Sequence, residues 1–276
     1  MTVREALKQA EQTLSQVPDP RIDAELLLSH VMGMERMRMR LEGAMELSGE
    51  QEQRFASLLL SRARRIPLQY LVGSQCFYGL EMATDCRALI PRQETEELCE
   101  LGIAFLKKLP APVALDLCTG SGAIAVALKH ECPHAQVHAA DISAVALSLA
   151  RENAARNAAD IAFHFGDVWN AVGELRFDLI LSNPPYIPTK DCQTLQPEVQ
   201  KEPRLALDGG ADGLDFYRRI AGEATRHLLP GGLLAVEVGD EQAGAVRQLF
   251  ESAGLSGVSV HQDLYGLSRM VSARFT

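Results

Sequence analysis

Residues 113–123 of the chain read Val-Ala-Leu-Asp-Leu-Cys-Thr-Gly-Ser-Gly-Ala. The apolar run Val113–Cys118 predicts a short buried strand, and the residues from Ala123 onward predict a helix. A strand, a turn containing Gly120 and Gly122, and a helix are typical of an α/β sheet that binds a ligand beyond the carboxyl ends of its strands. Glycine suits such a turn because it lets the backbone bend tightly and approach a ligand closely.

Strands and helices alternate from residue 113 to the end of the chain, which is typical of a doubly wound, mostly parallel sheet with helices on both faces. The expected strands are Val113–Cys118, Gln136–Ala140, Ala162–Phe165, Phe177–Leu181 and Leu233–Val238. The expected helices are Ala123–His130, Ala144–Asn157, Asp215–His227 and Gln242–Ser252. Two further extended runs, Ser256–Gln262 and Met270–Phe275, close the chain.

The first 72 residues predict a small domain made only of helices. The segment Ser48-Gly49-Glu50-Gln51 fits a capping box at the start of one of them. A hairpin turning at Gly79 follows, and a helix from Ile90 to Leu109 leads into the sheet. We therefore expect a helical domain at residues 1–72, a linker hairpin at residues 73–90 and a sheet domain at residues 91–276. The helical domain either stabilises the protein or docks a macromolecular partner, and its residues leave both roles open.

The charge of the chain is uneven. The formal net charge is -9, and all of the excess acid lies after residue 72, because residues 1–72 carry ten acidic and ten basic side chains. An acidic sheet domain argues against tight, non-specific binding to duplex nucleic acid, which needs clustered lysine and arginine. With 47% hydrophobic and 23% charged residues, the chain has the composition of a globular enzyme with a sizeable core.

The six cysteines and seven histidines show neither metal-ligand spacing nor a disulfide framework. We therefore expect no metal, and thiols that stay reduced in the cytosol. The charged start of the chain does not resemble a signal peptide, and no apolar run reaches the roughly 20 residues that span a bilayer. The expectation is a cytoplasmic, monomeric protein that does not bind membranes.

Polar residues follow the ends of the second and third expected strands. Asp141 and Ile142 end the second, where a carboxylate can accept hydrogen bonds from both hydroxyls of a ribose. Asp167 ends the third and can accept from an adenine amino group, while Val168 or Trp169 covers the ring. Because the carboxyl ends of parallel strands meet at one edge, these residues predict an adenosine-type ligand there.

The loop Asn183-Pro184-Pro185-Tyr186 follows the fourth expected strand. Each proline fixes its own φ angle and restricts the residue before it, so the loop is stiff. The amide of Asn183, the carbonyl of Pro184 and the ring of Tyr186 suit a planar group that carries an NH2. No strong base is evident near the loop, so catalysis would depend on orientation and electrostatic placement.

These motifs resemble the class I S-adenosylmethionine-dependent methyltransferases, whose Rossmann-like sheet has seven strands, the sixth and seventh antiparallel. The Asn-Pro-Pro-Tyr loop marks members that methylate amide or exocyclic amino nitrogens. Further segments are similar to the HemK family of peptide-chain-release-factor glutamine N5-methyltransferases. They are residues 90–96, Glu202-Pro203, residues 207–214, Gly231-Gly232-Leu233, and Glu237-Val238-Gly239 with Gln242. The resemblance covers nearly the whole chain, including the helical domain and the hairpin.

The resemblance implies an enzyme that transfers a methyl group from S-adenosyl-L-methionine. The acceptor would be the side-chain N5 of the glutamine in the Gly-Gly-Gln motif of class I release factors. This methylation would tune translation termination. The other product would be S-adenosyl-L-homocysteine, and no metal would be needed. The helical domain would dock the release factor, and no nucleic-acid substrate is expected.

The resemblance also extends to residues of the site. The cofactor would be bound by Asp116, Cys118, Thr119, Gly120, Ser121, Gly122, Asp141, Ile142, Asp167, Val168, Trp169 and Asn183. The catalytic residues would be Asn183, Pro184 and Tyr186. The substrate would contact Asn183, Pro184, Pro185, Tyr186, Arg92 and Glu94. We expect the Asn183 side-chain oxygen and the Pro184 carbonyl to accept the two N–H bonds of the substrate amide, while Tyr186 stacks on the amide plane.

Three residues depart from the usual pattern of this family, and one of them is Val168, which stands where an aromatic residue often follows the aspartate at the third strand end. Cys118 stands where the family usually has glycine, so its Cβ requires an unstrained backbone and slightly crowds the ligand. Gln93 stands where the family usually has proline, which loosens a turn. The neighbouring residues Arg92 and Glu94 are retained.

Three other functions fit part of the pattern. A ribosomal-protein glutamine methyltransferase would share the fold and the Asn-Pro-Pro-Tyr loop, although residues 92–96 favour a release factor. A nucleic-acid methyltransferase would grip an exocyclic amine with the same loop, but the acidic sheet domain and the absence of a target-recognition insertion argue against it. A non-catalytic adenosine-binding module would have no need of an intact loop at residues 183–186.

Overall fold

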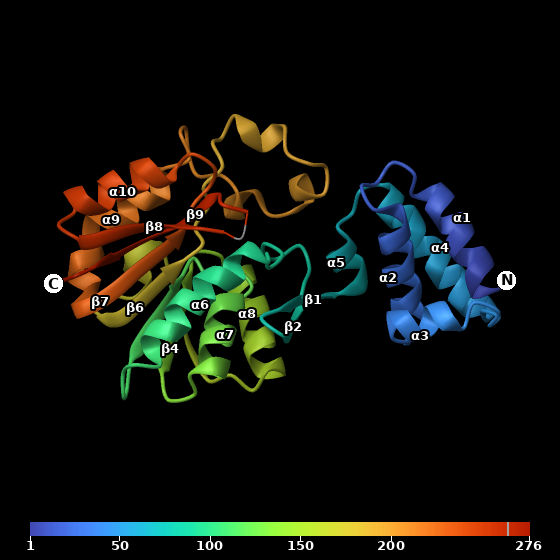
Figure 1. Ribbon diagram of the computed structural model, residues 1–276, viewed down its shortest axis with the longest axis horizontal. Helices are drawn as coiled ribbons and strands as arrows, with labels where there is room; N and C mark the ends of the chain where they lie inside the picture. The colour runs from blue at the N-terminus through green and yellow to red at the C-terminus, as the bar shows by residue number, and fades with distance from the viewer. Residues whose placement is uncertain (264) are drawn as a thin grey trace. The chain divides into compact units, whose positions relative to one another are not determined.

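The computed structural model describes residues 1–263 and 265–276, and their contacts divide the chain into two compact units (Figure 1). The first unit consists of Met1–Ser74 and Gln196–Lys201. The second consists of Gln75–Leu195 and Glu202–Thr276. The short segment Gln196–Lys201 therefore belongs with the N-terminal helices, although in the sequence it interrupts the second unit.

Helices α1 (Val3–Thr13), α2 (Pro20–Met32), α3 (Arg36–Leu41), α4 (Gly49–Ala63) and α5 (Leu68–Val72) build the first unit. Capping boxes start α1 at Thr2 and α4 at Ser48, and in each the cap residue and the third helical residue exchange hydrogen bonds. The capping box expected at Ser48 is thus confirmed. Apolar side chains of α1, α2 and α4, among them Ala10, Leu28 and Phe55, form a core of their own.

Two arginines at the end of α4 hold the segment Gln196–Lys201 in the first unit. Arg65 donates to both carboxylate oxygens of Glu198 at 2.6 Å. Arg62 donates to Glu198 at 2.8 Å and to Asp23 at 2.6 Å. Burial alone would raise the pKa of Glu198, but the hydrogen bonds from Arg65 and Arg62 outweigh it and lower this pKa to about 2. These side chains therefore fix a distant part of the chain to the helices.

A hairpin of β1 (Ser74–Phe77) and β2 (Leu80–Ala83) precedes the sheet. Tyr78 and Gly79 form its turn with φ angles of 51° and 75°, and tight hairpins favour such positive values. The turn expected at Gly79 is confirmed. From Gln75 onward, the hairpin belongs to the second unit.

Among the described residues of the second unit, seven strands form one sheet. They are β3 (Val113–Leu117), β4 (Gln136–Asp141), β5 (Ile161–Phe165), β6 (Phe177–Ser182), β7 (Leu228–Glu237), β8 (Ser256–Gln262) and β9 (Ser268–Arg274), in the order β5-β4-β3-β6-β7-β9-β8. Neighbours from β5 to β7 are parallel, whereas β9 is antiparallel to both β7 and β8. The expected seven-stranded Rossmann-like sheet with antiparallel closing strands is therefore confirmed.

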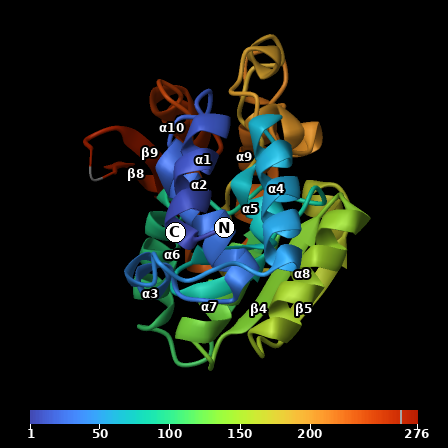
Figure 2. The same ribbon diagram turned by 90° about the vertical axis from the view of Figure 1, so that its right-hand side faces the viewer.

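Helices cover both faces of this sheet (Figures 1 and 2). Helices α6 (Glu94–Leu106), α7 (Ala123–Glu131) and α8 (Ala144–Arg156) lie over one face, and α9 (Asp215–His227) and α10 (Ala243–Ser252) lie over the other. Successive residues of β6 enter different cores, because Leu179 and Leu181 belong to one cluster and Ile180 to the other. Burial on both faces explains why the strands are almost continuously apolar.

Helix α6 is shorter than the expected helix from Ile90 to Leu109. The residue before a proline disfavours the helical conformation, and Ile90 precedes Pro91. The backbone N–H of Ile90 is instead taken by the carboxylate of Glu202 at 2.8 Å. The segment before Glu94 is therefore a loop, which becomes part of the site described next.

Candidate active site

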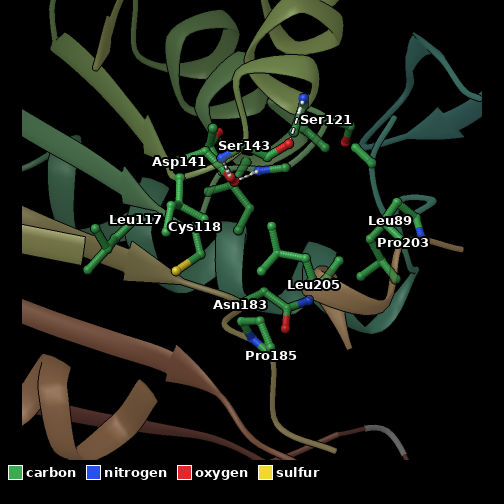
Figure 3. Close-up of a pocket in the computed structure, with 18 of the residues that line it drawn as sticks. Leu89, Leu117, Cys118, Ser121, Asp141, Ser143, Asn183, Pro185, Pro203 and Leu205 are labelled. Atoms are coloured by element: carbon green, nitrogen blue, oxygen red, sulfur yellow. Dashed lines mark hydrogen bonds between the residues drawn. The ribbon is translucent and has the colours of Figure 1, made fainter. Parts of the chain in front are cut away.

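The carboxyl ends of β3, β4 and β6 surround one pocket in the second unit (Figure 3). Strand β3 lies between β4 and β6, so the strand order changes direction there, as is usual at ligand sites of such sheets. The empty space of the pocket is about 980 Å³ when its open mouth is included. The expected site residues that line the pocket are Arg92, Cys118, Thr119, Gly120, Ser121, Asp141, Ile142, Asp167, Val168, Asn183 and Pro185.

Asp116 supports the turn after β3 from beneath. Its carboxylate accepts hydrogen bonds from the hydroxyl of Thr119 and from the backbone N–H of Ala125 in α7. The side chain has no exposed surface, and burial raises its pKa to about 7. Asp116 lies outside the pocket lining, so the structure makes it a support of the turn rather than part of the wall.

The turn itself contains left-handed backbone conformations. Cys118 lines the pocket with a φ of 63°, where a Cβ costs about 1–2 kcal/mol. The unstrained backbone required for a side chain at this position is therefore not what the structure shows. Gly122 lies outside the lining and has a φ of 82°, and a Cβ there would come 2.9 Å from the Cβ of Ala150. Gly122 thus lets α7 start close to α8.

Asp141 is the carboxylate at the end of β4 that faces the pocket (Figure 3). One oxygen accepts the backbone N–H of Gly120 and the other accepts that of Ser143, both at 2.8 Å. Burial raises the pKa of Asp141, and the backbone hydrogen bonds oppose this shift. Because a carboxylate oxygen can accept more than one hydrogen bond, both oxygens can still bind hydroxyl groups of a ligand.

The structure separates the three residues that were expected together after β5. Val168 lines the pocket with a φ of 49°, an uncommon angle for a β-branched residue. Trp169 is only 5% exposed, stacks on His227 with ring centroids 4.4 Å apart and donates to the carbonyl of Arg219. Of these two residues Val168 therefore faces the pocket, and Trp169 belongs to the core. Asp167 lines the pocket and pairs with Arg219 at 2.6 Å, a partner that the sequence did not indicate.

Asn183 lies on the side of the pocket opposite Asp141 (Figure 3). Its side-chain nitrogen donates to Oγ1 of Thr95 at 3.0 Å, and the Thr95 hydroxyl donates to Oε2 of Glu237 at 2.6 Å. Glu237 is 4% exposed, and burial raises its pKa to about 7. Neither Thr95 nor Glu237 was among the expected site residues. Both stand in segments that resemble the HemK family, but no sequence spacing connects them to Asn183.

The rest of the Asn-Pro-Pro-Tyr loop is divided between the pocket and the core. Pro185 lines the pocket, whereas Pro184 and Tyr186 lie outside the lining. The ring of Tyr186 packs against the core beneath α9 and α10, and its carbonyl accepts from the side chain of Gln242 at 2.8 Å. A Cβ on Gly209 would come 2.7 Å from the Cα of Tyr186, so only glycine fits there. The loop is therefore clamped between Gln242 and Gly209.

The two charged residues expected to contact the substrate are placed differently. Arg92 lines the pocket, and its guanidinium pairs with Glu202, the carboxylate that also holds the Ile90 N–H. Glu94 lies outside the lining and is the first residue of α6. A negative charge is favoured at that position by the helix dipole.

Residues 1–263 and 265–276 contain no group of three or more histidine, cysteine, aspartate or glutamate side chains that could hold a metal ion. The cysteines are free thiols; Cys99 and Cys132 are buried, and Cys76 and Cys86 are exposed. Over the same residues, no helix combines the length and the apolar character needed to cross a membrane.

Two protein-family models match the chain. The PrmC N-terminal domain matches residues 5–73, and the methyltransferase small domain matches residues 99–205. The first range falls within the helical unit, and the second includes the strands and turns that carry Asp141 and Asn183.

Three similar proteins are all release factor glutamine methyltransferases. The one from Deinococcus radiodurans is 42% identical over 276 residues and matches along 99% of both chains. The one from Geobacter sulfurreducens is also 42% identical, over 99% of this chain and 96% of its own. The one from Cereibacter sphaeroides is 46% identical over 91% and 90% of the two chains.

Solved structures with lower sequence identity share the fold. A methyltransferase from Pyrococcus furiosus superposes with a TM-score of 0.53 at 21% identity, over 78% of this chain and 98% of its own. The hMettl16 catalytic domain, solved with an RNA hairpin of the MAT2A 3′UTR, gives a TM-score of 0.60 at 15% identity, over 86% and 85% of the two chains. A 16S rRNA methyltransferase from T. thermophilus, solved with AdoMet and guanosine, gives 0.52 at 17% identity, over 74% and 50%.

Proposed function

The chain belongs to the family of release factor glutamine methyltransferases, and we propose that it transfers a methyl group from S-adenosyl-L-methionine to the side-chain N5 of a release-factor glutamine. The acceptor would be the glutamine of the Gly-Gly-Gln motif in class I factors. One observation carries this proposal. A single pocket has the ribose-type acceptor Asp141 on one side and, on the other, Asn183 with its nitrogen already bonded within the protein.

The residues present fit S-adenosyl-L-methionine. Asp141 offers two carboxylate oxygens to the two ribose hydroxyls, and the turn at Thr119 and Gly120 lets a ligand approach the backbone. Ile142 and Val168 offer apolar surfaces for a purine ring. When bound, S-adenosyl-L-methionine supplies a methyl group already activated on a sulfonium sulfur, so the reaction calls for no metal.

The amide nitrogen of glutamine is a poor nucleophile because its lone pair is delocalised into the carbonyl. The protein must therefore contribute orientation and charge placement rather than proton abstraction. The oxygen of Asn183 and the carbonyl of Pro184 would accept the two N–H bonds and aim the lone pair at the methyl group. The glutamine nitrogen would then gain the methyl group and give one proton to solvent. The cofactor, having lost its methyl group, would become S-adenosyl-L-homocysteine. Tyr186, whose ring packs in the core, would hold the loop rather than stack on the amide.

We also propose the division of labour along the chain. Residues 1–72 would dock the release factor, and residues 91–276 would carry out the methyl transfer. Residues 73–90 would form the linker between these two domains. The match of residues 5–73 to the PrmC N-terminal domain supports treating this part of the chain as a domain of its own. The enzyme would act as a monomer in the cytoplasm, where translation ends.

Transfer of a labelled methyl group tests the proposed function. The protein is incubated with methyl-labelled S-adenosyl-L-methionine and, separately, with release factors, ribosomal proteins, tRNA and DNA. Label should enter only the release factors, and a release factor with alanine in place of the Gly-Gly-Gln glutamine should remain unlabelled. Label in ribosomal proteins or in nucleic acid, with none in the release factors, would overturn the assignment.

A further inference from the structure

We propose that Thr95 and Glu237 are positioning residues, which hold the Asn183 side-chain amide with its oxygen turned to the pocket and its nitrogen turned away. The proposal rests on the proposed function, since an oxygen in this position is what a substrate NH2 group requires. It is carried by two hydrogen bonds in series, a part-buried one from Asn183 to Thr95 at 3.0 Å and a buried one from Thr95 to Glu237 at 2.6 Å. Neither residue was expected to act at the site.

The direction of these two hydrogen bonds follows from the number of protons that each group can donate. A hydroxyl has one proton to donate, and an ionised carboxylate can only accept. If Glu237 is ionised, Thr95 must donate to it, and the hydroxyl oxygen is then left to accept from Asn183. The amide nitrogen, and not the amide oxygen, therefore faces Thr95. The Asn183 oxygen is left as the side-chain atom that can accept a hydrogen bond from the substrate.

Protonation of Glu237 removes this constraint. A protonated carboxyl group can donate to the Thr95 oxygen, so the Thr95 proton becomes free to point at the Asn183 oxygen. The amide could then turn over and present its nitrogen to the pocket, where it would oppose the NH2 group of the substrate. The protonation state of Glu237 thus selects which end of the Asn183 amide meets the substrate.

The surroundings of Glu237 allow both protonation states near neutral pH. Burial, with a smaller contribution from Glu94, raises its pKa to about 7, although Thr95, Arg269 and Asn183 act to lower it. Glu237 also contributes to the raised pKa values of Tyr186, Tyr217 and Cys99, which remain neutral in this range. These three groups therefore add no titration of their own between pH 6 and pH 8.

Two substitutions at Thr95 test the network. Thr95→Val keeps the shape and removes the hydroxyl, and we expect kcat to fall about tenfold or more, as for a displaced group at a reacting centre. Thr95→Ser retains the hydroxyl and should keep kcat within about threefold of the wild type. Ser182→Ala is the matched control, because it removes a buried hydroxyl next to Asn183 that bonds to the carbonyl of Leu117 instead. Calorimetric binding of S-adenosyl-L-methionine should be unchanged in all three variants.

The pH profile separates positioning from a purely structural role. For the wild type at saturating substrates, kcat should fall about threefold or more from pH 8 to pH 6, as Glu237 takes up a proton. Glu237→Gln cannot ionise, so its kcat should be lower than that of the wild type at pH 8 and independent of pH. The proposal would be overturned if Thr95→Val had the kcat of the wild type. It would also be overturned if the kcat of Glu237→Gln fell from pH 8 to pH 6 as much as that of the wild type. Equal losses of kcat and cofactor binding in Thr95→Val would do the same, because they indicate a misfolded site.

These outcomes are distinct from failure of the proposed function. If the wild-type protein leaves release factors unlabelled, the substrate assignment fails before any variant is compared. If the wild type labels release factors and the variants label them equally well, the substrate assignment stands and only the positioning role is lost.

Discussion

The two sides of the pocket hold their central side chains in different ways. Asp141 is held by the backbone N–H groups of Gly120 and Ser143, which can only donate. Asn183 is held by the Thr95 hydroxyl, which can both donate and accept, and through it by the buried carboxyl group of Glu237. The cofactor side is therefore fixed by the course of the backbone. The substrate side depends on hydrogen bonds between side chains, and the protonation state of Glu237 determines which group donates in each.

The largest effect that this comparison predicts is a loss of turnover from a change on the substrate side. Asn183→Ala should lower kcat by about 10²- to 10³-fold, the range for loss of one preorganised hydrogen-bonding group at a reacting centre. Binding of S-adenosyl-L-methionine should change much less, because Asp141 and its backbone donors are untouched. Single-turnover methylation and calorimetry measure the two quantities. Near-normal turnover in this variant would remove Asn183 from the catalytic role.

The opposite pattern is expected from the cofactor side. Asp141→Ala should weaken binding of S-adenosyl-L-methionine by about 1–3 kcal/mol, the cost of losing charged hydrogen bonds, with a smaller effect on kcat at saturation. Asp178→Ala is the matched control, since Asp178 also accepts a strand N–H, that of Val113 at 2.8 Å, but lies near the start of β6. Titration calorimetry should show full affinity for the control. Equal affinity of the Asp141 variant and the wild type would refute the ribose role.

The same contrast explains which features could be predicted from the sequence. The strands, the glycine-containing turn and Asp141 are encoded locally, in apolar runs, glycines and a residue at a strand end, so the pattern of one short segment reveals each of them. The bond between Thr95 and Glu237 joins residues that lie far apart in the chain, and no local pattern carries that information. The choice between Val168 and Trp169 stayed open for a similar reason, because His227, on which Trp169 stacks, comes from α9.

Stability should depend on pH through both sides of the pocket. Asp116 beneath the cofactor turn and Glu237 behind Asn183 have pKa values raised by burial to about 7. The folded protein therefore keeps protons that the unfolded chain releases near its ordinary carboxyl pKa, about 4. The resulting stability is fully present below that value and is lost as the pH rises through about 7. Each group contributes a slope of at most about 1.4 kcal/mol per pH unit.

Urea unfolding at pH 5 and pH 7.5 measures this slope. Asp116→Asn and Glu237→Gln should each lose less stability between the two pH values than the wild type, because the replaced group no longer titrates. Only Glu237→Gln should also flatten the pH profile of kcat, since Asp116 bonds to Thr119 and Ala125 and has no hydrogen bond to Thr95 or Asn183. A change in the acid limb of kcat by Asp116→Asn would contradict the separation of the two sides.

The smallest predicted effect concerns backbone strain in the cofactor turn. Cys118 and Gly120 both have left-handed backbone, with φ angles of 63° and 54°. Cys118→Gly should relieve about 1–2 kcal/mol of strain in the folded state, but glycine also makes the unfolded chain more flexible by about 0.5–1 kcal/mol. The net result should be a gain in stability of about 1 kcal/mol or less, with binding of S-adenosyl-L-methionine equal to or slightly tighter than in the wild type.

Gly120→Ala is the inverse control for this turn. No atom outside the adjacent residues lies within 4 Å of the Cβ that the substitution would add, so its effect reports on the backbone alone. The variant should lose about 1 kcal/mol of stability, because alanine is strained where φ is positive. Thermal unfolding of both variants gives the comparison. If Cys118→Gly loses stability while Gly120→Ala is neutral, backbone strain does not control this turn, and the rigidity of the cofactor side has another source.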